Sequence, residues 1–176
     1  MNLVKFSKDL GNLKPNRKLL LRRGYSDEMI DKLYIQEYQI EDKILNSKAL
    51  NHYKSIEARD FIELFNLERF RIRNISFPKK LEYVEKYLKV GEFDGGYLGL
   101  DEITGMIYII YSDNLNCVNE IFSTKDSEYF DILLIIAEYS KNVSEGKINA
   151  FDENAKNKFI EKCYSVCPSG SYEIFL

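Results

Sequence analysis

Apolar residues recur along the chain at two spacings, and these separate predicted helices from predicted strands. Spacings of three and four residues place apolar side chains on one face of a helix, whereas alternation or a short apolar run is typical of a strand. Ser26 followed by two acidic residues is typical of a helix start, because the hydroxyl caps free backbone amides. The helical spacing predicts helices over residues 26–45, 55–70, 125–142 and 152–164.

Strand patterns gather in the middle of the chain. The stretch GGYLGLDEITGMIYII predicts a β-hairpin over about residues 95–112, with Gly105 at the positive-φ position of its turn. A third strand is predicted over residues 116–122. Residues 69–74 fit the start of a strand or a basic edge, and residues 80–89 fit either a helix or a strand.

The order of the predicted elements is helices, then strands, then helices. This order predicts an α+β fold in which helices cover an antiparallel sheet with the hairpin at its centre. A length of 176 residues matches one domain, residues 1–176, and residues 1–50 are a candidate N-terminal helical extension of it. Residues 1–24 are expected to be a docked arm or helix, and residues 172–176 a tail or an edge strand.

Composition and the lengths of apolar runs predict a cytoplasmic protein. Hydrophobic residues make up 45% of the chain and charged residues 30%, which is enough for a packed core. The longest apolar run, residues 132–137, is too short to cross a membrane, and the N-terminal residues lack the apolar core of a signal peptide. Cys117, Cys163 and Cys167 have neither metal nor redox spacing, so we expect reduced structural thiols.

The chain contains no recognisable pattern of catalytic residues. His52 is the only histidine and lies in a polar stretch, and no nucleophile stands in a recognisable elbow. The glycines near residue 95 match neither a phosphate-binding loop nor a dinucleotide fingerprint. Asp101 and Glu102 are adjacent, so a strand would point them to opposite faces and a turn would leave both in solvent. We therefore expect no enzymatic activity, no metal and no cofactor.

Charge is distributed unevenly along the chain, whose net charge is −3. Residues 91–140 contain ten acidic residues and one basic residue, whereas residues 1–90 contain 19 basic and 13 acidic residues. The acidic segment either presents a surface to a basic partner or is neutralised by the basic half within the folded molecule. An isoelectric point near 5.4 argues against binding to nucleic acid.

Residues 77–142 combine several features in a fixed order. A strand ending in Gly, a strand reaching an acidic residue, a Thr-Gly turn and an apolar strand are followed by an Asn-bearing strand and a helix. The residues that carry this pattern are Gly91, Leu100, Asp101, Thr104, Gly105, Val118, Asn119, Phe130, Leu134 and Tyr139. In this pattern the chain resembles the SMI1/KNR4 (SUKH) superfamily, and in particular its bacterial SUKH-type immunity proteins.

The resemblance implies a non-enzymatic domain that binds other proteins. Bacterial members neutralise a cognate toxin, often a nuclease, whereas eukaryotic relatives act as regulatory scaffolds, which is the alternative function for this chain. A basic toxin domain is the expected partner. A nuclease binds phosphate groups through basic residues, and an acidic surface is electrostatically complementary to them. The candidate contact residues are Glu92, Asp94, Tyr97, Asp101, Glu102, Tyr111 and Asp113.

Overall fold

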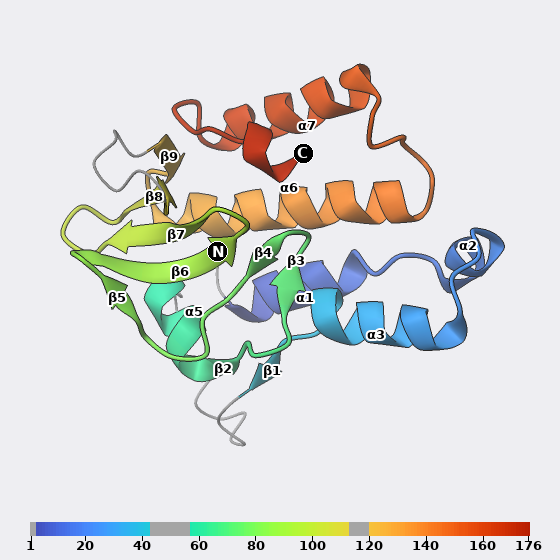
Figure 1. The fold of residues 1–176 in the computed structure, drawn as a ribbon, viewed down its shortest axis with the longest axis horizontal. Helices are drawn as coiled ribbons and strands as arrows, with labels where there is room; N and C mark the ends of the chain where they lie inside the picture. Colours follow the sequence, from blue (N-terminus) through green and yellow to red (C-terminus); the bar gives the residue numbers. More distant parts are fainter. Residues whose placement is uncertain (1–2, 43–56, 113–119) are drawn as a thin grey trace.

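Helices packed on an antiparallel sheet form the fold, which a computed structural model describes over residues 3–42, 57–112 and 120–176 (Figure 1). The predicted α+β class is confirmed. The helices are α1 (Leu3–Asn12), α2 (Arg17–Arg22), α3 (Asp27–Tyr38), α5 (Ala58–Leu64), α6 (Asp126–Ser144), α7 (Glu153–Val166) and the 3-10 helix η1 (Glu173–Phe175). The strands are β1 (Glu41–Asp42), β2 (Phe65–Asn66), β3 (Arg71–Ile72), β4 (Ile75–Ser76), β5 (Tyr83–Val84), β6 (Tyr87–Phe93), β7 (Gly96–Asp101), β8 (Met106–Tyr111) and β9 (Glu120–Ser123).

The main sheet is a meander with the predicted hairpin near its centre. Its strand order is β3-β4-β6-β7-β8-β9, with β5 paired to β6, and every pairing is antiparallel. Within the hairpin Tyr97 pairs with Ile110 and Asp101 pairs with Met106. Gly105 has a φ of 72°, a conformation that a residue without a side chain adopts freely, so the predicted turn is confirmed.

The predicted helices begin close to where they were expected, but two of them end early. Ser26 caps α3, and its hydroxyl accepts a hydrogen bond from the Met29 amide at 3.2 Å. That helix ends at Tyr38 instead of continuing to residue 45. The helix predicted over residues 55–70 ends at Leu64, because the next two residues are extended and pair with β1. This pairing joins distant segments, which a local apolar spacing does not reveal.

Several segments with ambiguous patterns are extended in the structure. Residues 80–89 form β5 and the start of β6 instead of a helix, and a tight turn at Glu85, with a φ of 55°, joins these two strands. Residues 69–74 contain the short strand β3. The third predicted strand is present from Glu120 onward, and its residues 116–119 lie outside the described part of the chain.

The C-terminal residues form η1 and do not add an edge strand to the sheet. Phe175 is fully buried, and its ring centroid lies 5.4 Å from that of Phe122 on β9. The side chain of Arg73 donates a hydrogen bond to the carbonyl oxygen of Leu176. The segment is therefore packed into the core and not free in solvent.

Helix α6 lies at the centre of the core, between α7 and the sheet (Figure 1). The hydroxyl of Tyr129 on α6 donates to the carbonyl oxygen of Val90 on β6 at 2.8 Å. The ring of Phe130 packs against Phe6 of α1, with 5.0 Å between the centroids. These contacts join the N-terminal helix, α6 and the sheet in one hydrophobic core. Within the described part of the chain, no helix is long and apolar enough to span a membrane.

Candidate protein-binding surface

Asp101 holds the turn of the β7–β8 hairpin in one shape. Its Oδ1 accepts hydrogen bonds from the amides of Ile103 at 2.9 Å and Thr104 at 3.3 Å. The Gly105 amide donates to the carbonyl oxygen of Asp101 at 2.8 Å. A carboxylate that binds the backbone two residues on is a standard way of ordering a turn. Residues 101–105, called the hairpin tip below, are therefore preorganised.

Glu102 is held beside the hairpin tip by two donors from other elements. Arg59 of α5 donates to its Oε1 at 2.6 Å, and the hydroxyl of Tyr83 on β5 donates to its Oε2 at 2.7 Å. The Tyr83 hydroxyl is the main cause of a lowered pKa at Glu102; partial burial opposes it, and the Arg59 guanidinium adds to it. Glu102 is thus a carboxylate at neutral pH, and the hairpin is tied to α5.

The end of the hairpin tip carries an apolar side chain in full contact with water. Ile103 is 97% exposed, the highest exposure among the large hydrophobic side chains of the described residues. Asp101 and Glu102 lie directly before it in the turn. An exposed apolar group on a rigid turn, flanked by carboxylates, suits a partner that has an apolar pocket with a basic rim.

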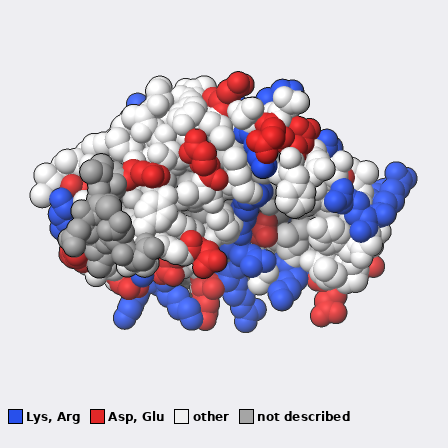
Figure 2. Space-filling view, turned by 45° about the horizontal axis from the view of Figure 1, so that its top comes forward, with Lys and Arg blue, Asp and Glu red and all other residues white. Residues whose placement is uncertain are grey.

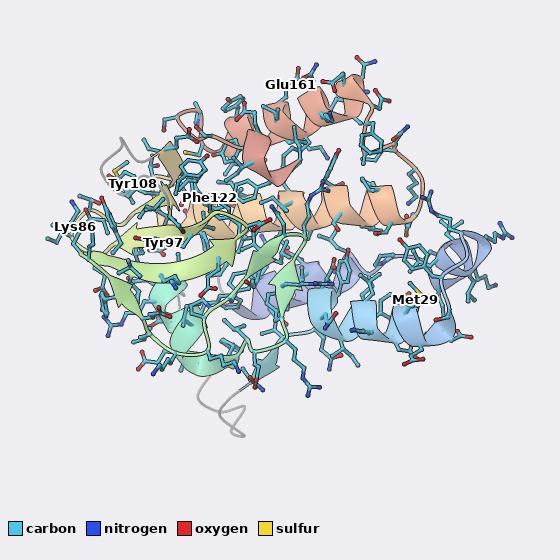
Figure 3. All side chains as sticks on the ribbon, in the orientation of Figure 1. Met29, Lys86, Tyr97, Tyr108, Phe122 and Glu161 are labelled. Atoms are coloured by element: carbon cyan, nitrogen blue, oxygen red, sulfur yellow. The ribbon has the colours of Figure 1, made fainter. Side chains whose placement is uncertain are left out.

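A second cluster of apolar side chains lies on the face of the sheet opposite to α6. Tyr87, Tyr97 and Ile110 are buried there against one another, with Val84 and Tyr108 packed beside them. Figure 3 shows Lys86, Tyr97 and Tyr108 at the end of the molecule away from α3. We call these five apolar residues, Val84, Tyr87, Tyr97, Tyr108 and Ile110, the outer cluster.

Gly99 lets the outer cluster close over the sheet. A β-carbon at this position would lie 2.6 Å from Cδ1 of Ile110 and 3.0 Å from Cβ of Tyr87. It would also lie 3.2 Å from Cε2 of Tyr97. Only a residue without a side chain lets these three groups approach one another across β7.

The two predicted aromatic contact residues lie on opposite faces of the sheet. Tyr97 belongs to the outer cluster and is only 6% exposed. Tyr111 packs its ring against Phe93 on the face toward α6, at 6.1 Å between centroids, and its hydroxyl donates to Glu120 at 3.3 Å. The structure therefore does not bring Tyr97 and Tyr111 into one patch.

The predicted acidic residues divide between the two ends of β7. Asp101 and Glu102 share the hairpin tip, whereas Asp94 is exposed in the turn between β6 and β7, about 20 Å away along the strand. Glu92 lies near Asp94, with its Oε1 3.3 Å from Nζ of Lys89. Asp113 lies outside the described residues. Of the predicted acidic residues, the structure thus places only Asp101 and Glu102 beside an exposed apolar side chain, that of Ile103.

Part of the acidic segment is neutralised within the molecule. Ion pairs join four of its carboxylates to Lys or Arg, and Asp126 accepts a hydrogen bond from the Ala58 amide at 2.7 Å. The four ion pairs are Glu92–Lys89, Glu102–Arg59, Glu128–Lys125 and Glu138–Lys162. Figure 2 shows acidic and basic side chains close together on the visible face, without one continuous acidic patch. Two of these pairs use bases of the N-terminal half, as the neutralisation alternative predicts.

Sequence reasoning missed three members of this surface. Ile103 was assigned only to the turn, and exposure of one turn residue leaves no periodic signal. Tyr83 lies in the segment whose helix or strand character stayed open, and Arg59 reaches Glu102 across 43 residues of chain. Residues 83–90 form parts of two strands, β5 and β6, which are defined by their pairing with each other and by the pairing of β6 with β7.

Two of the three cysteines lie within the described residues, and both belong to the hydrophobic core. Cys163 and Cys167 are buried and unbridged, and burial raises the pKa of Cys163 to about 12. Cys117 and His52 lie outside the described residues. Within the residues that are described, no three His, Cys, Asp or Glu side chains cluster closely enough to hold a metal ion.

Comparisons with protein-family models, with curated proteins and with solved structures gave no match for this chain. The resemblance to SUKH-type immunity proteins therefore stays a prediction from the sequence pattern.

Proposed function

We propose that this protein is a non-enzymatic, cytoplasmic immunity protein that binds and neutralises a basic bacterial toxin domain. The hairpin tip is the centre of the contact. Ile103 enters an apolar pocket of the toxin, and the carboxylates of Asp101 and Glu102 meet basic residues at its rim. The resemblance to SUKH-type immunity proteins supplies the class of partner.

The exposure of Ile103 on an ordered turn is the observation that carries this proposal. Leaving a large aliphatic side chain in water gains nothing for the folded monomer, whereas burying it in a partner stabilises the complex. Because Asp101 orders the turn before binding, little conformational entropy is lost when the partner arrives. Tyr83, which is 50% exposed, extends the contact beside Glu102.

The test uses the toxin domain encoded beside the gene of this protein. Co-expression should restore growth of cells that make the toxin, and the two purified proteins should elute as one complex. Ile103→Asp should weaken binding at least about 30-fold, because it places an unpaired charge in the apolar pocket. Phe151→Asp is the matched control, since Phe151 is 85% exposed and follows the C-terminal end of α6, a helix about 27 Å long.

Three outcomes separate the alternatives. Absence of both protection and a complex contradicts the immunity function. Protection with unchanged affinity for Ile103→Asp keeps the function but removes the hairpin tip from the contact. A stable complex with a neighbouring gene product that is not toxic indicates the regulatory or scaffold function instead.

A further inference from the structure

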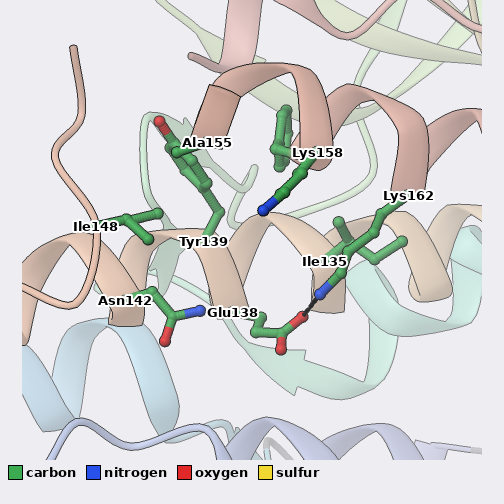
Figure 4. A pocket seen from close by; sticks show the side chains of 9 residues that line it. Ile135, Glu138, Tyr139, Asn142, Ile148, Ala155, Lys158 and Lys162 are labelled. Carbon is green, nitrogen blue, oxygen red and sulfur yellow. Dashed lines mark hydrogen bonds and ion pairs between the residues drawn. The ribbon is translucent and has the colours of Figure 1, made fainter. Parts of the chain in front are cut away.

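A pocket between α6 and α7 lies far from the hairpin tip and has apolar walls (Figure 4). Its volume is about 160 Å³. Ile135 and Tyr139 of α6, Ile148 of the connecting loop, and Ala155 and Phe159 of α7 line it. An apolar cavity of about 150 Å³ in a protein core is large enough to bind benzene. The pocket therefore has room for an apolar group the size of one six-membered ring.

The two aromatic walls of the pocket, Tyr139 and Phe159, pack against each other. The ring centroids of Tyr139 and Phe159 lie 4.9 Å apart. The guanidinium of Arg73, the residue after β3, lies 4.8 Å from the centroid of the Tyr139 ring. The hydroxyl of Tyr139 is buried and has no hydrogen-bond partner among the described residues. In Figure 4 this hydroxyl points toward Ala155 on α7.

The mouth of the pocket carries positive charge that is not fully compensated. Lys162 is paired with Glu138 at 2.8 Å. Lys158 is exposed, and within the described part of the chain it has no recorded ion-pair or hydrogen-bond partner. Figure 4 shows its ammonium group in front of the pocket, between the two helices. The amide of Asn142 adds a hydrogen-bonding group at the same rim.

We propose that this pocket binds a small monocarboxylic acid whose apolar body is about the size of a phenyl ring. The apolar body lies between Tyr139, Ile135 and Phe159. The carboxylate lies at the mouth, where the ammonium group of Lys158 pairs with it. This site is independent of the hairpin tip, since the two regions share none of the residues described above.

Phenylacetate is the test ligand, and 2-phenylethanol is its uncharged counterpart. Titrations of the isotope-labelled full chain, followed by NMR chemical shifts, should show saturation by phenylacetate with a dissociation constant of about 1 mM. Shift changes should map to the residues of α6 and α7 that face each other. The alcohol should bind about tenfold more weakly, because it lacks the charge that pairs with Lys158.

Two variants and one control locate the ligand. Lys158→Ala, an exposed position, should reduce affinity for phenylacetate about tenfold and leave affinity for the alcohol unchanged. Ala155→Leu should abolish binding of both ligands by filling the pocket while keeping a good helix former. Lys156→Ala is the matched control, because Lys156 pairs with Glu153 and does not line the pocket.

Several results overturn the proposal. Shift changes that map to the sheet, or equal affinities for acid and alcohol, contradict the assigned pocket or the assigned charge. Unchanged affinity of Lys158→Ala also contradicts it, and this surface variant is informative even where Ala155→Leu perturbs the fold.

Discussion

At the scale of single residues, the surroundings of Gly99 and Glu37 determine how a substitution at each position changes stability. Gly99 occupies a place where three groups of the outer cluster meet, so its lack of a side chain is required for packing. Glu37 is a carboxyl group that is only 8% exposed. For each residue, one substitution should change the free energy of unfolding by an amount that can be measured.

Gly99→Ala should destabilise the protein by about 1–3 kcal/mol, because the new methyl group overlaps Ile110 and the base of Tyr87. Gly11→Ala is the matched control. Nothing lies within 4 Å of a β-carbon there, and the residue is inside α1, so the same change should stabilise by about 0.5–1 kcal/mol. Chemical denaturation of both variants measures these differences, and a neutral Gly99→Ala would show that the outer cluster is loosely packed.

Glu37 should make stability fall as the pH rises. Burial raises its pKa, and this exceeds the opposing effects of Arg71 at 3.6 Å and the Ser140 hydroxyl at 3.5 Å. A raised folded-state pKa means that the stabilising contribution is complete below the unfolded value of about 4.3 and is lost as the pH passes through the folded value. Relative to the wild type, Glu37→Gln should gain stability between about pH 4 and about pH 7.

Urea unfolding at both pH values measures this change for Glu37→Gln. Glu161→Gln on the exposed face of α7 is the control and should follow the wild type at each pH (Figure 3). A stability difference between Glu37→Gln and the wild type that does not depend on pH would show that Glu37 does not titrate differently in the folded state.

At the scale of elements, α5 and α6 are joined at their N-termini. The first residue of α6, Asp126, accepts a hydrogen bond from the amide of Ala58, the first residue of α5. No side chain of its own N-cap residue, Glu57, caps α5. One carboxylate thus caps a helix that begins 68 residues earlier in the chain.

Asp126→Ala should lower the free energy of unfolding by about 1–2 kcal/mol, the usual cost of losing a helix cap. Asp131→Ala, five residues further along α6, should change it by less than about 0.5 kcal/mol. Hydrogen exchange adds a second readout, since amides in the first turn of α5 should lose protection only in Asp126→Ala. Equal effects of both variants would contradict the capping role.

Local chemistry explains which elements the sequence predicted well. The hairpin, the starts of α3 and α7 and the length of α6 depend on turn and cap residues within a few positions. The end of α5 and the strands in 80–89 depend on pairing partners elsewhere in the chain. The same division holds at the hairpin tip, where Asp101 and Glu102 were predicted from their own segment, whereas Arg59 and the exposure of Ile103 follow from tertiary structure.

At the scale of the whole molecule, the acidic charge should affect the association rate of a basic partner more than the dissociation rate of the complex. The acidic segment is partly paired internally, so its remaining field acts at long range and is screened by salt. Changing Asp101 and Glu102 together to Lys should slow association with the toxin at low salt at least about tenfold. The difference from the wild type should shrink as salt is raised.

Stopped-flow association at low and high salt tests this expectation. Glu153→Lys on α7 is the comparison, since it changes charge at a distant, exposed position. An association rate that is the same for the double variant and the wild type at all salt concentrations would contradict electrostatic steering by the hairpin tip.

The meander of β6 to β9 implies an order of folding. Each of these strands pairs with its neighbour in sequence, and α6 follows directly, so this part closes only short loops. Phe6 of α1 meets Phe130 only after more than a hundred residues are brought together. We therefore expect the sheet and α6 to form first and α1 to dock late, which would make the N-terminal helices the first to detach when the native protein opens.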